Sequence, residues 1–490
     1  MFPLITTTLF LPLLGAGILL AWPGAPPRAA HAVGIVTALL TLAGAIGIAA
    51  RGVRPAGFAQ VEQAAWIPTL GASYRVGVDG ISLFLALLTA LLFLLSFIYS
   101  SAVREQPRAY VALMLLLETA SIGTFTALDA LLFYVFFEVS LVSMYFLIGG
   151  WGHEDRHRAA LMFFLYTLLG SLPLLLAIFG LYLGSDPHTF DMRAWIAHPP
   201  LAGAAATLAL FAMLFTFAVK TPIIPLHTWL PASHVQAPTA GSVILAGVML
   251  KFGAYGLIRF ALQMTPHAFH RLAVVVLAVG VASALYGAFA ALAQSDLKRL
   301  VAYTSINHMG YIVIGVAVAA LTLDPNVRAL ALDGSVLQMI SHGLVTGALF
   351  FLVGMLQDRT HTRAIGRFGG VLGLLPVLGW SFVLAAFASL GLPALAHFPA
   401  EFQIFLATLR TAPAALVALL GIVVTAGLYL YAIQRVFMGQ PNPTWSGLTD
   451  LGARELLTLV PLLLLIVAIG VAPGWLLGVI HRTTSSVGLG

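Results

Sequence analysis

The sequence predicts an all-α polytopic membrane protein with about 14 transmembrane helices, and three observations lead to this class. Of the 490 residues, 60% are hydrophobic and only 8% are charged, and the mean hydropathy is +1.01. Soluble globular chains carry roughly 25% charged residues. Nearly every segment is an apolar run of roughly 20 residues, the length that crosses a bilayer. The connecting loops are short, so we expect no soluble domain.

The apolar runs place the helices one after another along the chain. The first run, "MFPLITTTLFLPLLGAGILLAW", has no basic residues before it and therefore indicates a membrane helix rather than a cleaved signal. Two runs, 201–235 and 371–411, are too long for one span and contain prolines, which predicts discontinuous helices 7 and 12. The expected spans are 2–22, 31–51, 80–101, 109–128, 130–150, 158–183, 201–235, 240–263, 270–293, 298–321, 328–356, 371–411, 414–438 and 455–479.

The chain also contains an internal repeat. "GSVILAGVMLK" aligns with "GIVVTAGLYLY", which places Lys251 opposite Tyr431, and proline-broken segments precede both stretches. We expect two inverted five-helix repeats, 109–263 (helices 4–8) and 270–438 (helices 9–13), between N-terminal helices 1–3 (1–108) and a C-terminal helix 14 (455–490). Paired interrupted helices indicate a transport site near the middle of the membrane. Chance similarity between helices rich in small residues is the alternative.

The amino-acid composition limits which kinds of functional site this chain can hold. The chain has no cysteine, which excludes disulfides, thiolate-held iron–sulfur clusters and cysteine metal sites. Only three of the 23 basic residues are lysines, Lys220, Lys251 and Lys298. Arginine stays charged, whereas a buried lysine can release its proton. Two of these lysines lie inside membrane segments and are candidates for proton exchange, although a biased base composition also makes lysine rare.

Ionisable side chains within the apolar segments are the candidate functional residues. A charge in the hydrocarbon costs about 2.5–3.5 kcal/mol on insertion scales, so such residues are functional candidates by default. Together they alternate acids, amines and imidazoles, as proton movement through intervening water requires. No nucleotide-binding loop, haem-ligand pair or metal-ligand cluster accompanies them, which favours ion transport without redox chemistry in this chain. The candidates are Glu118, Glu138, Lys220, Lys251, His308, His342 and Glu401.

Lys220 precedes the helix break in "FAVKTPIIPLHTWLP". Pro222 and Pro225 lack an N–H, so two backbone carbonyls lose their helical partners and need protein groups or water. Burial favours the neutral amine, whereas a nearby carboxylate favours the ammonium. We expect Glu138 to be that carboxylate, and its contact with Lys220 to control the proton on the lysine. A static ion pair that only joins two helices is the alternative.

Lys251, His308 and His342 are the next candidates for proton transfer after Lys220. Lys251 has no helix break of its own and is expected to be a central relay. His308 and His342 are expected to pass protons, because a neutral imidazole both donates and accepts a hydrogen bond. Interhelical hydrogen bonding is the alternative for both histidines, and packing is the alternative for Glu118.

Glu401 follows the second broken segment, where Pro393 and Pro399 are the expected helix breaks. We expect it to release protons to the far side of the membrane, and a helix cap is the alternative. His234 and Lys298 are possible accessory residues, His234 either at a gate or at a helix end.

Four stretches resemble the antiporter-like membrane subunits of respiratory complex I, and the M-type (chain 4) in particular. They are "FFEVSLVSMYFLIGGWG", "FAVKTPIIPLHTWLPASHVQAPTAGSVILAGVMLKFGAYGLIRF", "DLKRLVAYTSINHMGYI" and "LQMISHGLVTGALFFLVG". The resemblance extends over nearly the whole chain. It implies a proton half-channel in each repeat, with Glu138, Lys220, Lys251 and Glu401 at the family's charged positions. One departure is "GLPALAHFPAEF", where Ala400 replaces the glycine that usually precedes the last glutamate.

The resemblance implies a proton-translocating membrane subunit of NADH–quinone oxidoreductase in a bacterial inner membrane. It implies no cofactor in this chain; NADH, FMN, iron–sulfur clusters and quinone are expected in partner subunits. The expected partners are the lipid bilayer and other membrane subunits, including neighbouring antiporter-like ones, and not nucleic acid. Two alternatives are a subunit of a multi-subunit cation/proton antiporter, which has no redox partners, and a scaffold subunit that only packs its neighbours.

Overall fold

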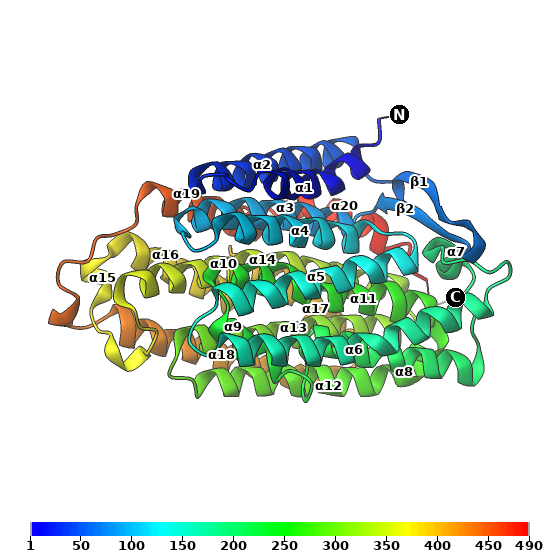
Figure 1. Ribbon diagram of the computed structural model, residues 1–490. Helices are drawn as coiled ribbons and strands as arrows, with labels where there is room; N and C mark the ends of the chain where they lie inside the picture. Colours follow the sequence, from blue (N-terminus) through cyan, green and yellow to red (C-terminus); the bar gives the residue numbers. More distant parts are fainter. Residues whose placement is uncertain (1, 489–490) are drawn as a thin grey trace.

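The computed structural model describes residues 2–488 and is a bundle of long, roughly parallel helices (Figure 1). Within these residues, 13 helices are long and apolar enough to cross a membrane, and the shorter apolar helix Pro376–Ser389 forms half of a broken span. The expected all-α polytopic class, with its discontinuous helices, is confirmed.

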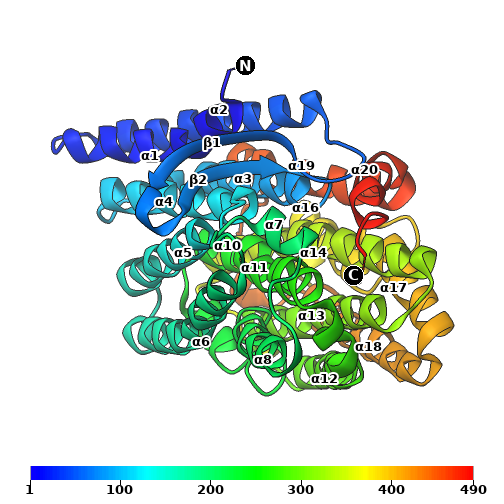
Figure 2. The same cartoon turned by 90° about the vertical axis from the view of Figure 1, so that its right-hand side faces the viewer.

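The first six membrane helices run from α1 and α2 at the top of the bundle in Figure 1 down to α6 near its lower edge. They are α1 (Leu4–Ala21), α2 (Pro27–Arg51), α3 (Ser82–Tyr99), α4 (Pro107–Thr126), α5 (Ala130–Trp151) and α6 (Arg156–Gly184). Proline occupies the first position of α2 and α4, where a helix N–H has no partner in any case. Helices α1 and α2 lie as an outer layer over α3 and α4 (Figure 2). Most of their surface therefore stays exposed on this chain.

The first broken helix consists of α8 (Gly203–Lys220) and α9 (Trp229–Gln236). The expectation that a carbonyl freed by Pro222 finds a protein group or water is confirmed for Ala218, whose partner is a protein group. The Ala218 carbonyl accepts a hydrogen bond from the Ile223 N–H at 3.1 Å, and the Val219 carbonyl accepts one from the Trp229 indole N–H at 3.0 Å. Protein groups thus stabilise the break from within.

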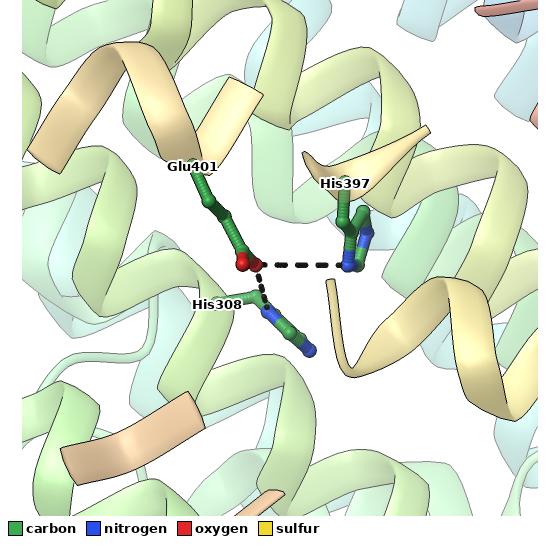
Figure 3. A group of neighbouring side chains, drawn as sticks. All are labelled: His308, His397 and Glu401. Carbon is green, nitrogen blue, oxygen red and sulfur yellow. Dashed lines mark ion pairs between the residues drawn. The ribbon is translucent and has the colours of Figure 1, made fainter. Parts of the chain in front are cut away.

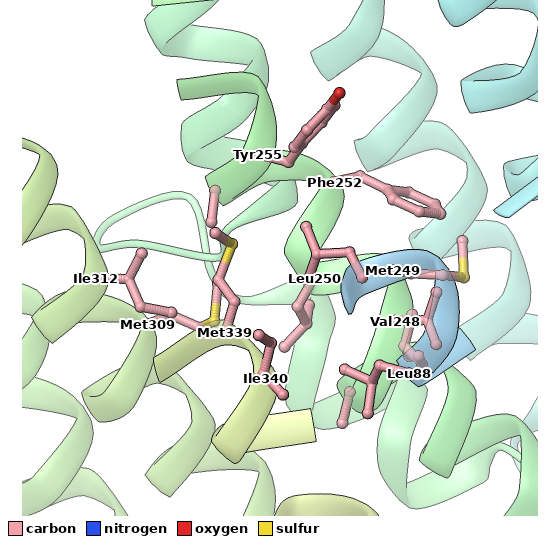
Figure 4. Packing of buried hydrophobic residues seen from close by; sticks show 14 of the residues in the cluster. Leu88, Val248, Met249, Leu250, Phe252, Tyr255, Met309, Ile312, Met339 and Ile340 are labelled. Carbon is pink, nitrogen blue, oxygen red and sulfur yellow. The ribbon is translucent and has the colours of Figure 1, made fainter. Parts of the chain in front are cut away.

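The next membrane segment is continuous but not uniformly α-helical. It consists of α10 (Thr239–Ile244), a π-helical turn (Leu245–Met249), α11 (Leu250–Gly256) and a second π-helical turn (Leu257–Leu262). This segment and α14 (Pro325–Thr360) are the two membrane segments whose most apolar stretch is fully buried. Their apolar side chains, such as Leu250 and Met339, pack together in the centre of the bundle (Figure 4).

The remaining elements complete the bundle. They are α12 (Pro266–Leu292), α13 (Leu297–Leu321), α15 (Val371–Leu374), α16 (Pro376–Ser389), α17 (His397–Thr411), the 3-10 helix Pro413–Leu419, α18 (Leu420–Ala432), a π-helical turn (Ile433–Phe437), α19 (Ala453–Val471) and α20 (Gly474–Thr484). Helices α16 and α17 form the second broken helix. The expected single helix 455–479 is wrong, because α19 ends before Pro473, whose ring removes a helical N–H.

Two elements outside the membrane helices were not anticipated from the sequence. Strands β1 (Ala59–Ile67) and β2 (Ala72–Val78) form an antiparallel hairpin at one end of the bundle (Figure 1). The short helix α7 (Met192–Ala197) begins at Asp191, whose carboxylate accepts the Arg193 N–H. The prediction that this end carries only short loops is therefore wrong.

A buried ion pair ties this end together. Arg259, in the π-helical turn after α11, pairs with Asp79, which follows β2, and both side chains are at most 2% exposed. The Asp79 carboxylate also accepts the backbone N–H groups of Ile81 and Ser82 at 3.0 and 2.9 Å. Removing one member of such a pair leaves the other charge buried and uncompensated.

We therefore expect Arg259→Met to lower the free energy of unfolding by about 3–5 kcal/mol. The control is Arg193→Met, because Arg193 is 36% exposed in its pair with Asp191 and an exposed pair contributes about 0–1 kcal/mol. Thermal unfolding of the two variants in detergent compares them. Equal stability of the two variants would contradict the role given to the buried pair.

Candidate functional site

A buried contact between a lysine and a histidine lies at the centre of the bundle. The Nζ of Lys251, on α11, is 2.7 Å from Nδ1 of His342, on α14, and both residues are 0% exposed. Lys251 also donates to the carbonyl of Ala246, in the preceding π-helical turn. When Lys251 is an ammonium it has only donors, so Nδ1 of His342 is then the acceptor and the ring proton is on Nε2.

His308, on α13, connects this contact to Glu401, on α17. Its ring centroid lies 5.8 Å from that of His342, and its Nδ1 is 3.3 Å from Oε1 of Glu401 (Figure 3). Gln338, one helical turn before His342 on α14, donates to the same carboxylate oxygen at 3.2 Å. We call Lys251, His342, His308 and Glu401 the central line. The structure brings these four expected residues together.

A chain of hydroxyl groups fixes the tautomer of His308. Nε2 of His308 lies 3.1 Å from the Ser389 hydroxyl, which donates to Tyr429 at 3.1 Å. Tyr429 lies 3.2 Å from Thr304, whose hydroxyl donates to the Val301 carbonyl. Each hydroxyl proton is thus directed away from His308. Nε2 of His308 must donate, which leaves a lone pair on Nδ1 facing Glu401.

His397 is a residue of this site that the sequence analysis missed. Its Nδ1 lies 3.8 Å from Oε1 of Glu401 and 3.3 Å from the Ser389 carbonyl (Figure 3). Its ring is 4.5 Å from that of His308 and almost parallel to that of His342. The signal was present in the sequence, because residues four apart on a helix lie on the same face and His397 precedes Glu401 by four.

Lys220 and Glu138 lie near each other without a direct ion pair. Lys220 is the last residue of α8 and is 3% exposed, and its Nζ has no hydrogen-bond partner among the described residues. It lies 4.5 Å from the ring centroid of Phe137. Glu138 follows Phe137 on α5 and interacts electrostatically with Lys220, but the two form no ion pair within 4.0 Å. The alternative of a static ion pair is not what this structure shows.

A glycine sets the distance between α8 and α11. A Cβ on Gly253 would lie 2.6 Å from the backbone nitrogen of Thr221 and 2.9 Å from the Phe217 carbonyl. Thr221 directly follows Lys220, and Gly253 lies two residues after Lys251. The close approach therefore holds the end of the broken helix against the segment that carries Lys251.

The accessory residues occupy two different places. Glu118, on α4, is 0% exposed, and neither of its carboxylate oxygens has a hydrogen-bond partner among the described residues. His234 stacks on Phe350 at 4.6 Å between ring centroids and is close enough to Lys298 and Lys251 to interact with their charges. Lys298 donates to the Ala237 carbonyl at 3.1 Å.

A polar cavity of about 940 Å³ opens at the end of the bundle near Lys298. Asp296, Asp358 and Gln236 are among the residues that line it, together with His153 in the loop after α5. Burial and the charges of Lys298 and Arg363 lower the pKa of His153 to about 4. The neutral ring can therefore accept and donate hydrogen bonds at neutral pH.

The prolines of the two breaks differ in their roles. Pro222 and Pro225 lie between α8 and α9, and Pro393 lies between α16 and α17. Pro399 lies in the first turn of α17 and does not interrupt it, because a first-turn N–H has no helical partner. Ala400 is likewise helical and buried. The glycine that allows the second break is Gly391, where φ is +76° and a Cβ would lie 2.6 Å from Oε2 of Glu401.

Comparisons with known proteins agree with this geometry. Residues 127–428 match the family described as "NADH:quinone oxidoreductase/Mrp antiporter, TM". NADH-quinone oxidoreductase subunit M of Rickettsia prowazekii is 38% identical over 99% of this chain and 98% of its own length. A chain of respiratory complex I from Thermus thermophilus superposes with a TM-score of 0.89 at 32% identity, covering 99% of this chain and 100% of that one.

The chain belongs to the subunit M family of NADH-quinone oxidoreductase. The Mrp complex from Dietzia sp. DQ12-45-1b shares the fold, with a TM-score of 0.86 at 22% identity over 99% of this chain and 98% of that chain. At that identity the likeness is one of fold alone. The subunit M fold described above thus holds a buried line of lysine, histidine and glutamate, which runs from α11 through α14 and α13 to α17, the second half of a broken helix.

We expect Gly253→Ala to destabilise the protein by roughly 1–3 kcal/mol, because the added methyl group overpacks the contact between α8 and α11. Gly427→Ala, within α18, is the matched control, since a Cβ there meets nothing within 4 Å. Thermal unfolding midpoints of both variants measure the difference. A Gly253→Ala protein as stable as the control would show that this contact does not set the spacing.

Proposed function

We propose that this chain translocates protons as a membrane subunit of an NADH–quinone oxidoreductase. The observation that carries the proposal is the contact of Lys251 with His342 at 2.7 Å, continued through His308 to Glu401. NADH oxidation and quinone reduction, with FMN and iron–sulfur clusters, take place in partner subunits. The assembly is then located in the inner membrane of the bacterial cell.

Proton transfer along the central line follows from which atoms donate and accept. The Lys251 ammonium gives a proton to Nδ1 of His342, which releases the proton on its Nε2. The ring centroids of His342 and His308 lie 5.8 Å apart, and a water molecule carries the proton from one ring to the other. Nδ1 of His308 takes up a proton and passes it to the Glu401 carboxylate. His308 takes up and releases the proton at the same atom and keeps its tautomer, whereas the His342 ring has to turn over before Lys251 delivers the next proton, so that the lone pair faces Lys251 again.

Two routes supply the proton to Lys251. One begins at Lys220, whose amine lies at the helix break and responds to the charge on Glu138. The other begins in the polar cavity and passes Lys298 and His234, which interact electrostatically with each other. Because Glu138 is half-buried on α5, its charge can also act on a neighbouring antiporter-like subunit. Glu118 is buried on α4 and supplies no step in this scheme.

The division into repeats fits this scheme. In the proposed repeats 109–263 and 270–438, each copy contributes one broken helix. Lys251 is buried in the first copy, whereas Tyr431, opposite it in the alignment, is 42% exposed. The second copy instead contributes Glu401, from the helix after its break. The two copies therefore hold different groups of one proton path.

A second candidate is a subunit of a multi-subunit cation/proton antiporter. The observation that favours it is the shared fold with the Mrp complex. In that case the same buried line carries protons against another cation, with no dependence on NADH. Proton uptake driven by a sodium gradient in the absence of NADH separates the two candidates.

We expect Lys251→Met to reduce proton pumping and coupled NADH–quinone turnover by at least roughly tenfold, because removing one proton-transfer group slows such steps about 10²–10⁴-fold. Lys251→Arg should have the same effect, since arginine keeps its proton. Pumping and turnover are measured in membranes with assembly checked. Arg410→Met, at the exposed end of α17, controls for the loss of a basic residue.

Unchanged pumping in an assembled Lys251→Met complex would overturn the central line. The chain would then be a scaffold that only packs its neighbours.

A further inference from the structure

We propose that His308, His397 and Glu401 form a binding site for a divalent transition-metal ion, and that Zn²⁺ bound there blocks the proton path. Metal binding is independent of the function proposed above, whereas the inhibition rests on it. The three side chains come from α13 and α17 and converge in the interior of the bundle (Figure 3).

The distances between the candidate ligand atoms suit a metal ion. One ligand atom from each of the three residues lies within 4.8 Å of the other two. Two ligands of a tetrahedral zinc ion lie about 3.3 Å apart when the bonds to the metal are about 2.0–2.1 Å long. Oε1 of Glu401 is 3.3 Å from Nδ1 of His308 and 3.8 Å from Nδ1 of His397. Both distances to Glu401 are thus within about half an ångström of the spacing in a zinc site.

The hydrogen bonds around His308 leave room for a cation. Its Nε2–H donates to Ser389, so its Nδ1 lone pair faces the carboxylate oxygen of Glu401. Nδ1 is buried and forms no hydrogen bond with any described residue. Two lone pairs 3.3 Å apart repel unless a proton or a metal ion lies between them. The Ser389 contact also orients the ring, as outer partners of metal-binding histidines do.

His397 needs a change of tautomer to bind. Its Nδ1–H donates to the Ser389 carbonyl at 3.3 Å, a long contact, while its Nε2 has no partner among the described residues. Moving the proton to Nε2 frees Nδ1 for the metal. The fourth position is then available to water or to the second oxygen of Glu401.

The ligand types indicate zinc rather than magnesium or calcium. Imidazole nitrogen suits Zn²⁺ and its first-row neighbours, whereas Mg²⁺ and Ca²⁺ prefer oxygen ligands throughout. Two histidines, one glutamate and one open position form a known type of zinc site.

We place the entry of zinc at the second helix break, beside the buried Glu401 carboxylate. Leu392, in the turn between α16 and α17, is 42% exposed, and Gly391 beside it has no side chain to cover Oε2 of Glu401. Zinc that reaches Glu401 takes the lone pairs of Glu401 and His308 that the proton path requires. Inhibition follows from that competition.

The test compares zinc binding and zinc inhibition in the assembled complex. Metal-stripped complex is dialysed against buffers of fixed free Zn²⁺, and the bound zinc is counted. We expect His397→Asn to retain one zinc ion fewer than the unaltered complex, and its pumping to need at least about tenfold more zinc for half-inhibition. His198→Asn, exposed at the end of α7, is the control and should match the unaltered complex. The inhibition by zinc is measured relative to the pumping of the same variant without zinc.

Equal zinc content in the unaltered and His397→Asn complexes would overturn the site. Loss of one zinc ion in His397→Asn, with pumping of the unaltered complex insensitive to zinc, would keep the site and overturn the inhibition together with the place of Glu401 in the proton path. If the variant fails to assemble, X-ray absorption at the zinc edge of the loaded, unaltered complex decides. Two imidazoles and one carboxylate around zinc support the site, and oxygen ligands alone overturn it.

Discussion

The hydrogen bond between Lys251 and His342 is the contact on which the rest of the buried site depends. An ammonium in the hydrocarbon region has to be enclosed by protein groups that accept its protons, because no bulk water is present. The two helical segments that supply these groups are also the two whose apolar stretches are fully buried. Full enclosure keeps lipid away from the pair, and the π-helical turn before Lys251 places the Ala246 carbonyl within its reach. The same arrangement that stabilises the charge holds the amine against the imidazole.

The His308 ring is oriented by hydroxyl groups, which do not titrate near neutral pH. Ser389, Tyr429 and Thr304 pass hydrogen bonds in one direction, away from His308. The ring therefore presents a lone pair to Glu401 and not a second N–H. These hydroxyls lie on three different helices, α13, α16 and α18, so the tautomer of one imidazole depends on the packing of the second half of the chain. Such a dependence explains why a relay of this kind needs a rigid bundle.

The sequence predicted the membrane spans and both broken helices, because length, hydropathy and proline position are local properties. It also identified the ionisable residues of the central line, since a charge in an apolar run is conspicuous. It did not identify Ser389, Tyr429 or Gln338, because hydroxyls and amides are common in membrane helices and only their three-dimensional neighbours distinguish them. The β1–β2 hairpin was missed although "ASYRVGV" alternates apolar and polar side chains, since so short a run is a weak strand signal between long apolar helices. The carbonyls freed at the first break were expected to need protein groups or water, and only the fold reveals that Ile223 reaches the Ala218 carbonyl and that Trp229 reaches the Val219 carbonyl.

The sequence "GLPALAHFPAEF" determines where the second broken helix bends. Ala400 lies within α17 and is helical, so the bend does not occur there. It occurs in the turn before α17, where φ is positive at Gly391 and Ala394 and where a side chain on Gly391 would collide with Glu401. Placing the bend earlier allows α17 to begin at His397, one turn before Glu401 and on the same face. A helix that began after residue 400 would leave His397 in the connecting turn, free of this geometry. The early start of α17 is thus what gives the carboxylate a second imidazole neighbour.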